Sequence, residues 1–194
     1  MHLLSRRRLG ALSVVALPLL SIAWTEPAGG MTDAAPHRAV RPAQASPRDS
    51  LAVNIGGSDI KVNYGRPSKR GRVLFNGLPD MKWGMVWRTG ANSATHFTTS
   101  KTLAFGPHIV PAGTYTLYTK LMENGKWDLI VNKQTTQWGT TYDEKQDLVR
   151  IPLTVTTNNP VVEKMEITVK PAGKGGEIAI AWDNYKAVAP FVVK

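Results

Sequence analysis

No cysteine occurs among the 194 residues of the chain. Disulfides, thiolate catalysis, cysteine-based metal sites and lipid attachment through an N-terminal cysteine are therefore excluded. A small domain without disulfides must rely on its hydrophobic core for stability. The 149 residues from Ser46 to Lys194 are sufficient, because a chain of about 150 residues buries roughly 70% of its unfolded surface on folding.

Long hydrophobic runs are also missing. The main apolar stretch, Leu9 to Ala23, is shorter than the about 20 residues that a membrane-spanning helix needs. It follows Arg6-Arg7-Arg8, and a charged start before a short apolar core is typical of a signal peptide. We therefore predict a signal peptide over residues 1–23. Ser5 to Leu9 also resembles a twin-arginine export signal; a general-secretion signal and an uncleaved anchor are the alternatives.

Residues 24–45 are rich in Ala, Pro, Gly and Arg and show no apolar periodicity. Such a composition predicts a disordered linker between the signal and the folded domain. Together the two segments predict an exported protein, periplasmic or extracellular, with no stable membrane span after signal removal.

The excess of positive charge is moderate and dispersed. From Ser46 onward 19 Lys and Arg face 12 Asp and Glu, a net charge of +7. The basic residues are scattered along the chain instead of forming a block, and an exported protein rarely meets nucleic acid. We therefore predict no nucleic-acid partner, and a surface that favours anionic polymers or membranes.

Helical periodicity is absent, whereas alternation of apolar and polar residues is frequent. Leu51, Val53 and Ile55 alternate with polar or small residues, and the same pattern recurs between residues 60 and 64, 115 and 121, 149 and 155, 161 and 169, and 178 and 182. A period of two is typical of half-buried strands. We predict one all-β domain over 46–194, an antiparallel two-sheet sandwich, jelly-roll-like, of roughly eight to ten strands.

Turn residues separate these strands. Gly56-Gly57-Ser58-Asp59 predicts a hairpin, and Asn124-Gly125 predicts a type I′ turn because both residues tolerate positive φ. Pro152 cannot donate a ladder hydrogen bond, so its strand is predicted to lie at an edge or a bulge. Two segments, 66–95 and 133–147, lack periodicity, and long irregular loops in compact domains are often functional.

Four motifs resemble a known family. They are Tyr64-Gly65-Arg66-Pro67 with Gly71-Arg72; Val86-Trp87-Arg88-Thr89-Gly90-Ala91-Asn92 with Ala94-Thr95; Pro111-Ala112-Gly113-Thr114-Tyr115; and Asn132-Lys133-Gln134 with Gln137-Trp138-Gly139, Tyr142-Asp143 and Asp147. In this order they are similar to the bacterial domain of unknown function 2911, from about Ser46 to Phe191. The resemblance implies an exported β-rich domain and no particular reaction.

The same loops carry the side chains best suited to bind a ligand. Arg88 offers a planar fork of donors for a carboxylate or phosphate, and aromatic rings with nearby amides suit a sugar. We predict a site for a small polar ligand, a glycan or a peptide end, without catalysis and without a cofactor. The predicted ligand-binding residues are Trp87, Arg88, Asn92, Asn132, Gln137, Trp138, Tyr142, Asp143 and Asp147.

Several alternatives stay open. Arg88 would instead pair with Asp143 or Asp147 as a structural latch, with Trp87 and Trp138 as lids on the core. A hydrolase would use Asp143 or Asp147 with Tyr142. An assembly domain would present a sheet edge near Pro152. His96 and His108 show no metal-ligand spacing, so no metal site is predicted.

Overall fold

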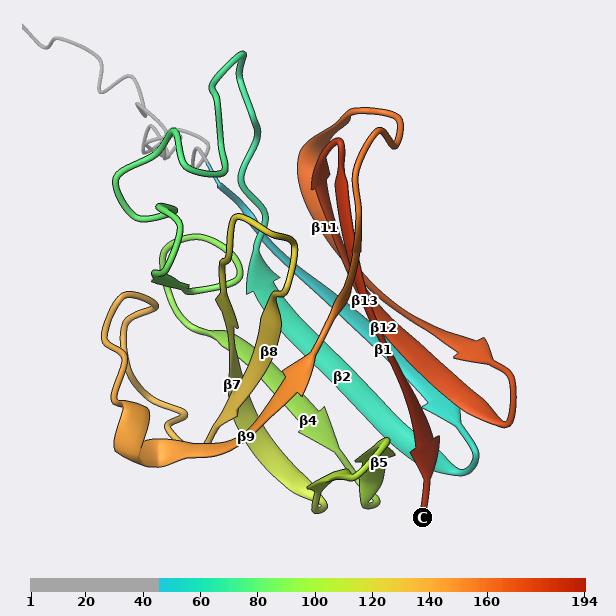
Figure 1. Cartoon of the computed structure of the whole chain (residues 1–194). Coiled ribbons are helices and arrows are strands. Elements are labelled where there is room, and N and C mark those ends of the chain that lie inside the picture. Colours follow the sequence, from blue (N-terminus) through green and yellow to red (C-terminus); the bar gives the residue numbers. More distant parts are fainter. Residues whose placement is uncertain (1–45) are drawn as a thin grey trace, which may run out of the picture. The chain divides into compact units, whose positions relative to one another are not determined.

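The computed structural model describes residues 46–194 and folds them into thirteen strands in two antiparallel sheets (Figure 1). The predicted signal peptide (1–23) and linker (24–45) lie outside the described residues. A short 3₁₀ helix, Glu144–Gln146, accompanies the strands. No helix within 46–194 is long and apolar enough to cross a membrane. The predicted all-β, two-sheet architecture is confirmed.

The first sheet has seven strands. In spatial order it contains β1 (Arg48–Ile55), β2 (Ser58–Gly65), β4 (Thr95–Thr99), β7 (Gly113–Lys120), β8 (Asp128–Asn132) and β9 (Asp147–Pro152), and β3 (Val86–Trp87) also pairs with β7. One row of residues that pair across neighbouring strands consists of Ser50, Asn63, His96, Thr116, Asn132 and Asp147. The alternation of strand side chains places this polar row on the face away from the core.

The second sheet has six strands. Its order is β11 (Val162–Ala172), β12 (Gly175–Asp183), β13 (Tyr185–Val193), β5 (Leu103–Phe105) and β6 (His108–Val110), and β10 (Thr154–Thr156) pairs with β13. Thirteen strands exceed the eight to ten predicted, because β3, β5, β6 and β10 have only two or three residues each. Strands this short produce no recognisable alternation in a sequence.

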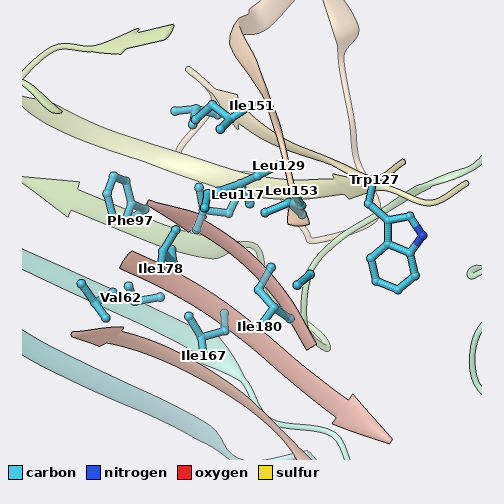
Figure 2. Close-up of a cluster of buried hydrophobic side chains, with 14 of the residues drawn as sticks. Val62, Phe97, Leu117, Trp127, Leu129, Ile151, Leu153, Ile167, Ile178 and Ile180 are labelled. Carbon is cyan, nitrogen blue, oxygen red and sulfur yellow. The ribbon is translucent and has the colours of Figure 1, made fainter. Parts of the chain in front are cut away.

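The core lies between the two sheets, as Figure 2 shows. Leu117 and Leu129 of the first sheet and Ile178 and Ile180 of the second are at most 5% exposed. An aromatic cluster extends the core at one end, where Trp87 stacks on Trp182 with ring centroids 5.8 Å apart. Packing of this extent is what allows the domain to dispense with disulfides.

Pro152 ends β9, which is the last strand of the first sheet, so the predicted edge position is confirmed. Directly afterwards the chain passes Leu153, which is buried, and enters β10 in the opposite sheet. A register shift between Val131 and Asn132 also disturbs the ladder between β8 and β9. The edge formed by β9 is therefore both short and irregular.

Two local predictions were wrong. The Gly125 amide donates to the Met122 carbonyl at 3.1 Å, so the turn centres on Glu123 and Asn124, and Gly125 has φ +70° while Asn124 is not in the positive-φ region. The reason is that the Trp127 indole donates to Met122 O at 2.8 Å and packs in the core, which lengthens the loop. By contrast, Gly56 and Gly57 have φ +57° and +76°, the predicted hairpin geometry.

The second error concerns Val161, predicted to point inward with Met165 and Ile167. It is 63% exposed. β11 begins one residue later, and its pairing with β12 shifts register between Val162 and Glu166. The bulge breaks the alternation that the sequence suggests at this point.

Candidate functional site

The two irregular segments meet at a glycine. The Gly139 amide donates to the Asn92 carbonyl at 3.1 Å, and Ser93 and Trp138 form an isolated β-bridge. A Cβ on Gly139 would lie 2.5 Å from Asn92 O and 2.8 Å from the Arg88 Cδ atom. Only glycine permits this approach, so the loop containing residues 133–147 is seated directly on the Arg88–Asn92 turn.

The structure divides the predicted site residues into two groups. Trp87, Arg88 and Asn92 line a pocket at the irregular segment 66–95. Asn132, Gln137, Tyr142, Asp143 and Asp147 belong to a hydrogen-bond network on the outer face of the first sheet. Trp138 lies beside the contact between Gly139 and Asn92. It neither lines the pocket nor takes part in the hydrogen-bond network.

Buried threonines hold the turn that presents Arg88. Thr89 adopts φ +51° and its hydroxyl lies 2.7 Å from that of Thr119 on β7. Thr95 Oγ1 donates to the Thr89 carbonyl at 2.8 Å. Asn92 adopts φ +63°, and its side-chain Nδ2 donates to Ser46 O at 3.3 Å. Uncommon backbone geometry at two non-glycine residues indicates that the turn is shaped by its surroundings.

Arg88 pairs with Asp80, not with Asp143 or Asp147, so that form of the latch is wrong. Its Nη2 atom lies 3.2 Å from Asp80 Oδ2, and its Nε donates to Gly90 O at 3.3 Å. Asp80 and Arg88 lie on the same irregular segment, and both border one pocket. Within residues 46–194 the Nη1 atom of Arg88 has no hydrogen-bond partner.

The pocket beside Arg88 has a volume of about 150 Å³. Leu78, Met81, Trp87 and Trp182 supply apolar walls, and Arg72, Asp80, Arg88 and Asn92 supply polar groups. An adjoining pocket of about 240 Å³ shares Ser46 and Arg72 and is completed by Ser68 and Arg70. In the first cavity two guanidinium groups, those of Arg72 and Arg88, face one carboxylate, an arrangement that favours anions.

The second group is centred on Asp147, whose side chain is 11% exposed. Tyr142 OH donates to Asp147 Oδ2 at 2.7 Å, and Arg150 donates to the same oxygen through Nε at 3.0 Å and Nη2 at 2.8 Å. Asn132 Nδ2 donates to Asp147 Oδ1 at 2.9 Å. Both carboxylate oxygens are thus occupied by intramolecular donors, which leaves none directed at a substrate.

Further hydrogen bonds seat the loop on the outer face of the sheet. Asn132 Nδ2 also donates to the Asp143 carbonyl, and its Oδ1 accepts from the Gln134 amide, both at 2.9 Å. The Asp143 amide donates to Gln134 Oε1 at 3.0 Å, and Asp143 Oδ1 accepts from the Lys145 amide at the start of the 3₁₀ helix. Asn132 is fully buried although it lies on the outer face, because the loop covers it.

Gln137 connects the loop to β7. Its Nε2 donates to Thr116 Oγ1 and to Tyr118 OH, each at 3.1 Å. Those hydroxyls in turn donate to the carbonyls of Gln134 and Thr141. Their protons are therefore committed, so the Gln137 amide must present its NH₂ group, and its Oε1 atom is left without a partner within the described residues.

The electrostatics of this network favour a fixed protonation state. Burial, with the Asp147 carboxylate as a further cause, raises the pKa of the Tyr142 hydroxyl well above its usual range. The hydrogen bond to Asp147 is the main cause that raises the pKa of Arg150. Burial also raises the pKa of Tyr118. These groups stay protonated at ordinary pH and act as donors, which suits a structural lock better than acid–base chemistry.

The two tryptophans have opposite environments. Trp87 is 2% exposed and is packed edge-on against Phe75 as well as on Trp182, as expected for a core residue. Trp138 is 54% exposed, so the alternative that made it a lid on the core is wrong. Its ring is the accessible aromatic surface next to Gly139.

His96 lies half-buried in the polar row, where burial and the nearby Arg48 lower its pKa, opposed by a hydrogen bond with the Thr135 backbone. Within residues 46–194 no three His, Asp or Glu side chains gather as metal ligands would.

Three residues of the sites were missed from the sequence. Asp80 and Arg72 lie in the segment 66–95, which lacks periodicity, and nothing in their spacing connects them to Arg88. Arg150 lies in the alternating stretch 149–155, where the pattern predicts only a polar face. A signal did exist for Arg150, because it follows Asp147 by three residues at the point where the loop enters β9.

Comparison with known proteins agrees with the motif order. The family described as Protein of unknown function (DUF2911) matches residues 46–191. The chain belongs to this family. The matched DUF2911 range includes every residue of the pocket and of the Asp147 network. No curated protein and no solved structure matches the chain.

Proposed function

We propose that this DUF2911 domain is exported and binds a small anionic ligand, a carboxylate or phosphate group carried by a glycan or a peptide end, without catalysis. The observation that carries the proposal is the pocket of about 150 Å³ in which Arg88 and Arg72 are opposed by one carboxylate, Asp80. The Arg6-Arg7-Arg8 start and the apolar stretch after it support export to the periplasm or beyond through a signal peptide.

The state of the guanidinium groups supports anion binding. Arg88 uses Nη2 and Nε within the chain, and Arg72 uses Nε and Nη2 on the carbonyls of Lys69 and Ser68. Both guanidinium planes are therefore held in place, and each retains an Nη1 atom with no partner among residues 46–194. Donors that are already oriented lose little side-chain entropy when a ligand arrives.

The size of the cavity restricts the ligand. A volume of about 150 Å³ accommodates a single anionic group with a few carbon atoms, and the adjoining cavity of about 240 Å³ can hold the next part of a longer molecule. The apolar walls formed by Leu78, Met81 and Trp182 lower the local dielectric and strengthen the attraction of an arginine for an anion.

The experiment is to titrate the purified chain with phosphate, acetate, glucuronate and a short peptide with a free carboxyl end. Calorimetry or NMR measures the binding. Arg88→Ala should abolish binding and leave the melting temperature within a few degrees of that of the parent. Lys82→Ala is the matched control, because Lys82 lies in the same segment, is exposed and does not line the pocket. Equal binding by Arg88→Ala and the parent would exclude the proposal.

A further inference from the structure

The four edges of the two sheets are protected to very different degrees. An edge strand exposes unpaired N–H and C=O groups, and proteins usually protect it with Pro, Lys, a bulge, a short length or a covering segment. At the edge formed by β9 there are Pro152 and a register shift. At the edge formed by β6 there are only three residues.

The edge of β11 is covered over its first half. The Met165 amide donates to the Pro67 carbonyl at 2.9 Å, and the Lys69 amide donates to the Glu163 carbonyl at 2.7 Å. The Ile167 amide donates to Tyr64 OH at 3.1 Å. Further along, Lys170 and Pro171 add two residues that disfavour pairing with another strand.

β1 lacks each of these devices. It has eight residues, no Pro and no Lys, and its pairing with β2 is regular from Arg48 to Ile55. Ser50, Ala52 and Asn54 alternate with the residues that bond to β2, so their backbone groups point away from it. Within residues 46–194 no strand pairs with this side of β1.

The space beside β1 is open. A groove of about 390 Å³ runs between β1 and β11, lined by residues 49–53, Tyr64 and residues 166–170. Two polar side chains of β1 are bonded elsewhere: Arg48 donates to Asn63 Oδ1 and to the carbonyls of Ser93 and Ala94, and Asn54 donates to Asp59. Asp49 lines the groove at its end.

We propose that β1 pairs antiparallel with β1 of a second copy of this chain, related by a two-fold axis at Ala52, so that two first sheets join into one. An isologous contact needs a patch that complements itself. In this register Leu51 faces Val53 of the second copy, Ser50 faces Asn54, and no two like charges are opposed. Leu51 and Val53 are only half-buried in one chain, so the contact would cover apolar surface as well.

The backbone groups of Ala52 and Asn54 carry the pairing. Ala52 would exchange two hydrogen bonds with Ala52 of the second copy, and Asn54 would bond to Ser50. The Ser50 amide donates to Asp49 Oδ1 at 2.8 Å in the single chain, so it has to change partner for its own bond to form. The proposal is independent of the anion pocket, which lies at other residues.

The absence of cysteine makes a direct test available. Residues of a hydrogen-bonded antiparallel pair have Cα atoms about 5.5 Å apart, a separation that a disulfide spans. A52C should therefore form a covalent dimer rapidly with diamide as the oxidant. K61C is the matched control, because Lys61 pairs with Ala52 on β2, is similarly exposed and lies one strand further from the edge.

The second measurement is sedimentation velocity of the full-length and signal-free chains over a range of concentrations. The parent should show a monomer–dimer equilibrium. Ala52→Pro removes two hydrogen bonds per dimer but none to β2, so it should weaken dimerisation about 30-fold. Circular dichroism checks that the variant is folded. A parent that is monomeric throughout, or equal cross-linking of A52C and K61C, would overturn the proposal.

Discussion

The segments 133–147 and 66–95 are both irregular in sequence, yet their polar side chains have opposite roles in the structure. In the first, the polar side chains are hydrogen-bonded to one another. Asp147, for example, accepts from Asn132, Tyr142 and Arg150. In the second, Arg72 and Arg88 line a cavity, and the Nη1 atom of each has no partner within residues 46–194. The comparison shows that a loop rich in polar residues indicates a site only when those residues are not satisfied internally.

The largest effect is expected at the centre of the locked segment. Asp147→Ala removes the acceptor shared by Tyr142, Arg150 and Asn132, and leaves a partly buried arginine without its main partner. We expect a loss of about 3 kcal/mol in the free energy of unfolding, measured by urea denaturation.

The matched control for this change is Glu144→Ala. Glu144 bonds to the same arginine at 2.6 Å, but its side chain is 73% exposed. Its removal should change stability by less than about 0.5 kcal/mol. If the two variants were equally stable, Asp147 would not be the centre of a structural lock and its role as a ligand or catalytic group would have to be reconsidered.

An intermediate effect is expected where the two segments touch. Gly139→Ala would place a methyl group 2.5 Å from Asn92 O and 2.8 Å from Arg88 Cδ. The loop has to move away, at a cost of about 2 kcal/mol, and the Arg88 turn should shift with it. Urea denaturation measures the cost, and NMR of the Asn92 and Ser93 amides reports the shift.

Thr140→Ala is the control for Gly139→Ala, because Thr140 is the exposed neighbour. It should leave both stability and the Asn92 resonance unchanged. A wild-type spectrum for Gly139→Ala would mean that the contact between the segments has no role in shaping the pocket.

The smallest effect concerns pH. The pKa of Tyr142 is raised by burial and by Asp147, so the folded chain keeps this proton when the unfolded chain loses it near pH 10. The stabilising contribution is therefore complete below about pH 10 and is lost progressively as the pH rises through the folded-state value. Stability should fall above about pH 10, as followed by urea denaturation at a series of pH values.

Tyr142→Phe isolates this contribution. It should be less stable at neutral pH, because the hydrogen bond to Asp147 is gone, and should show a weaker decline above about pH 10 than the parent. An identical decline in both proteins would assign the titration to other groups, of which Tyr118, also with a raised pKa, is the first to test.

Much of the fold followed from alternation. Leu51 to Tyr64 was predicted as a hairpin and forms β1 and β2, because side chains of period two can bury only one face of a strand. Alternation failed at Val161, where a bulge interrupts the register, and it could not detect β5 or β6, which are three residues long. The type I′ turn predicted at Asn124-Gly125 did not form, because Trp127 packs in the core and its indole bonds to Met122 O, which lengthens the loop.

Only part of the candidate site could be predicted from the sequence. That Arg88 and Asn92 lie together followed from their closeness in sequence, and both border the pocket. That Asp147 meets Arg150 did not follow, because residues three apart on a regular strand point to opposite faces, and here a bulge after Asp147 changes the alternation. That Arg88 meets Asp80 did not follow either, because nothing in the irregular segment predicts how it folds back. Ligand binding by the nine predicted residues stays a prediction.

The alternation of residues already specifies that this chain forms strands with one buried face, and its lack of cysteine already requires a core that is stable without cross-links. Which carboxylate neutralises which arginine was decided only by the folded backbone, through the bulge in β9 for Asp147 and Arg150 and the fold of the irregular segment for Asp80 and Arg88. The reason is physical: strand formation depends on neighbours one and two residues away, whereas the pairing of charges depends on distances that the chain reaches only after it has folded.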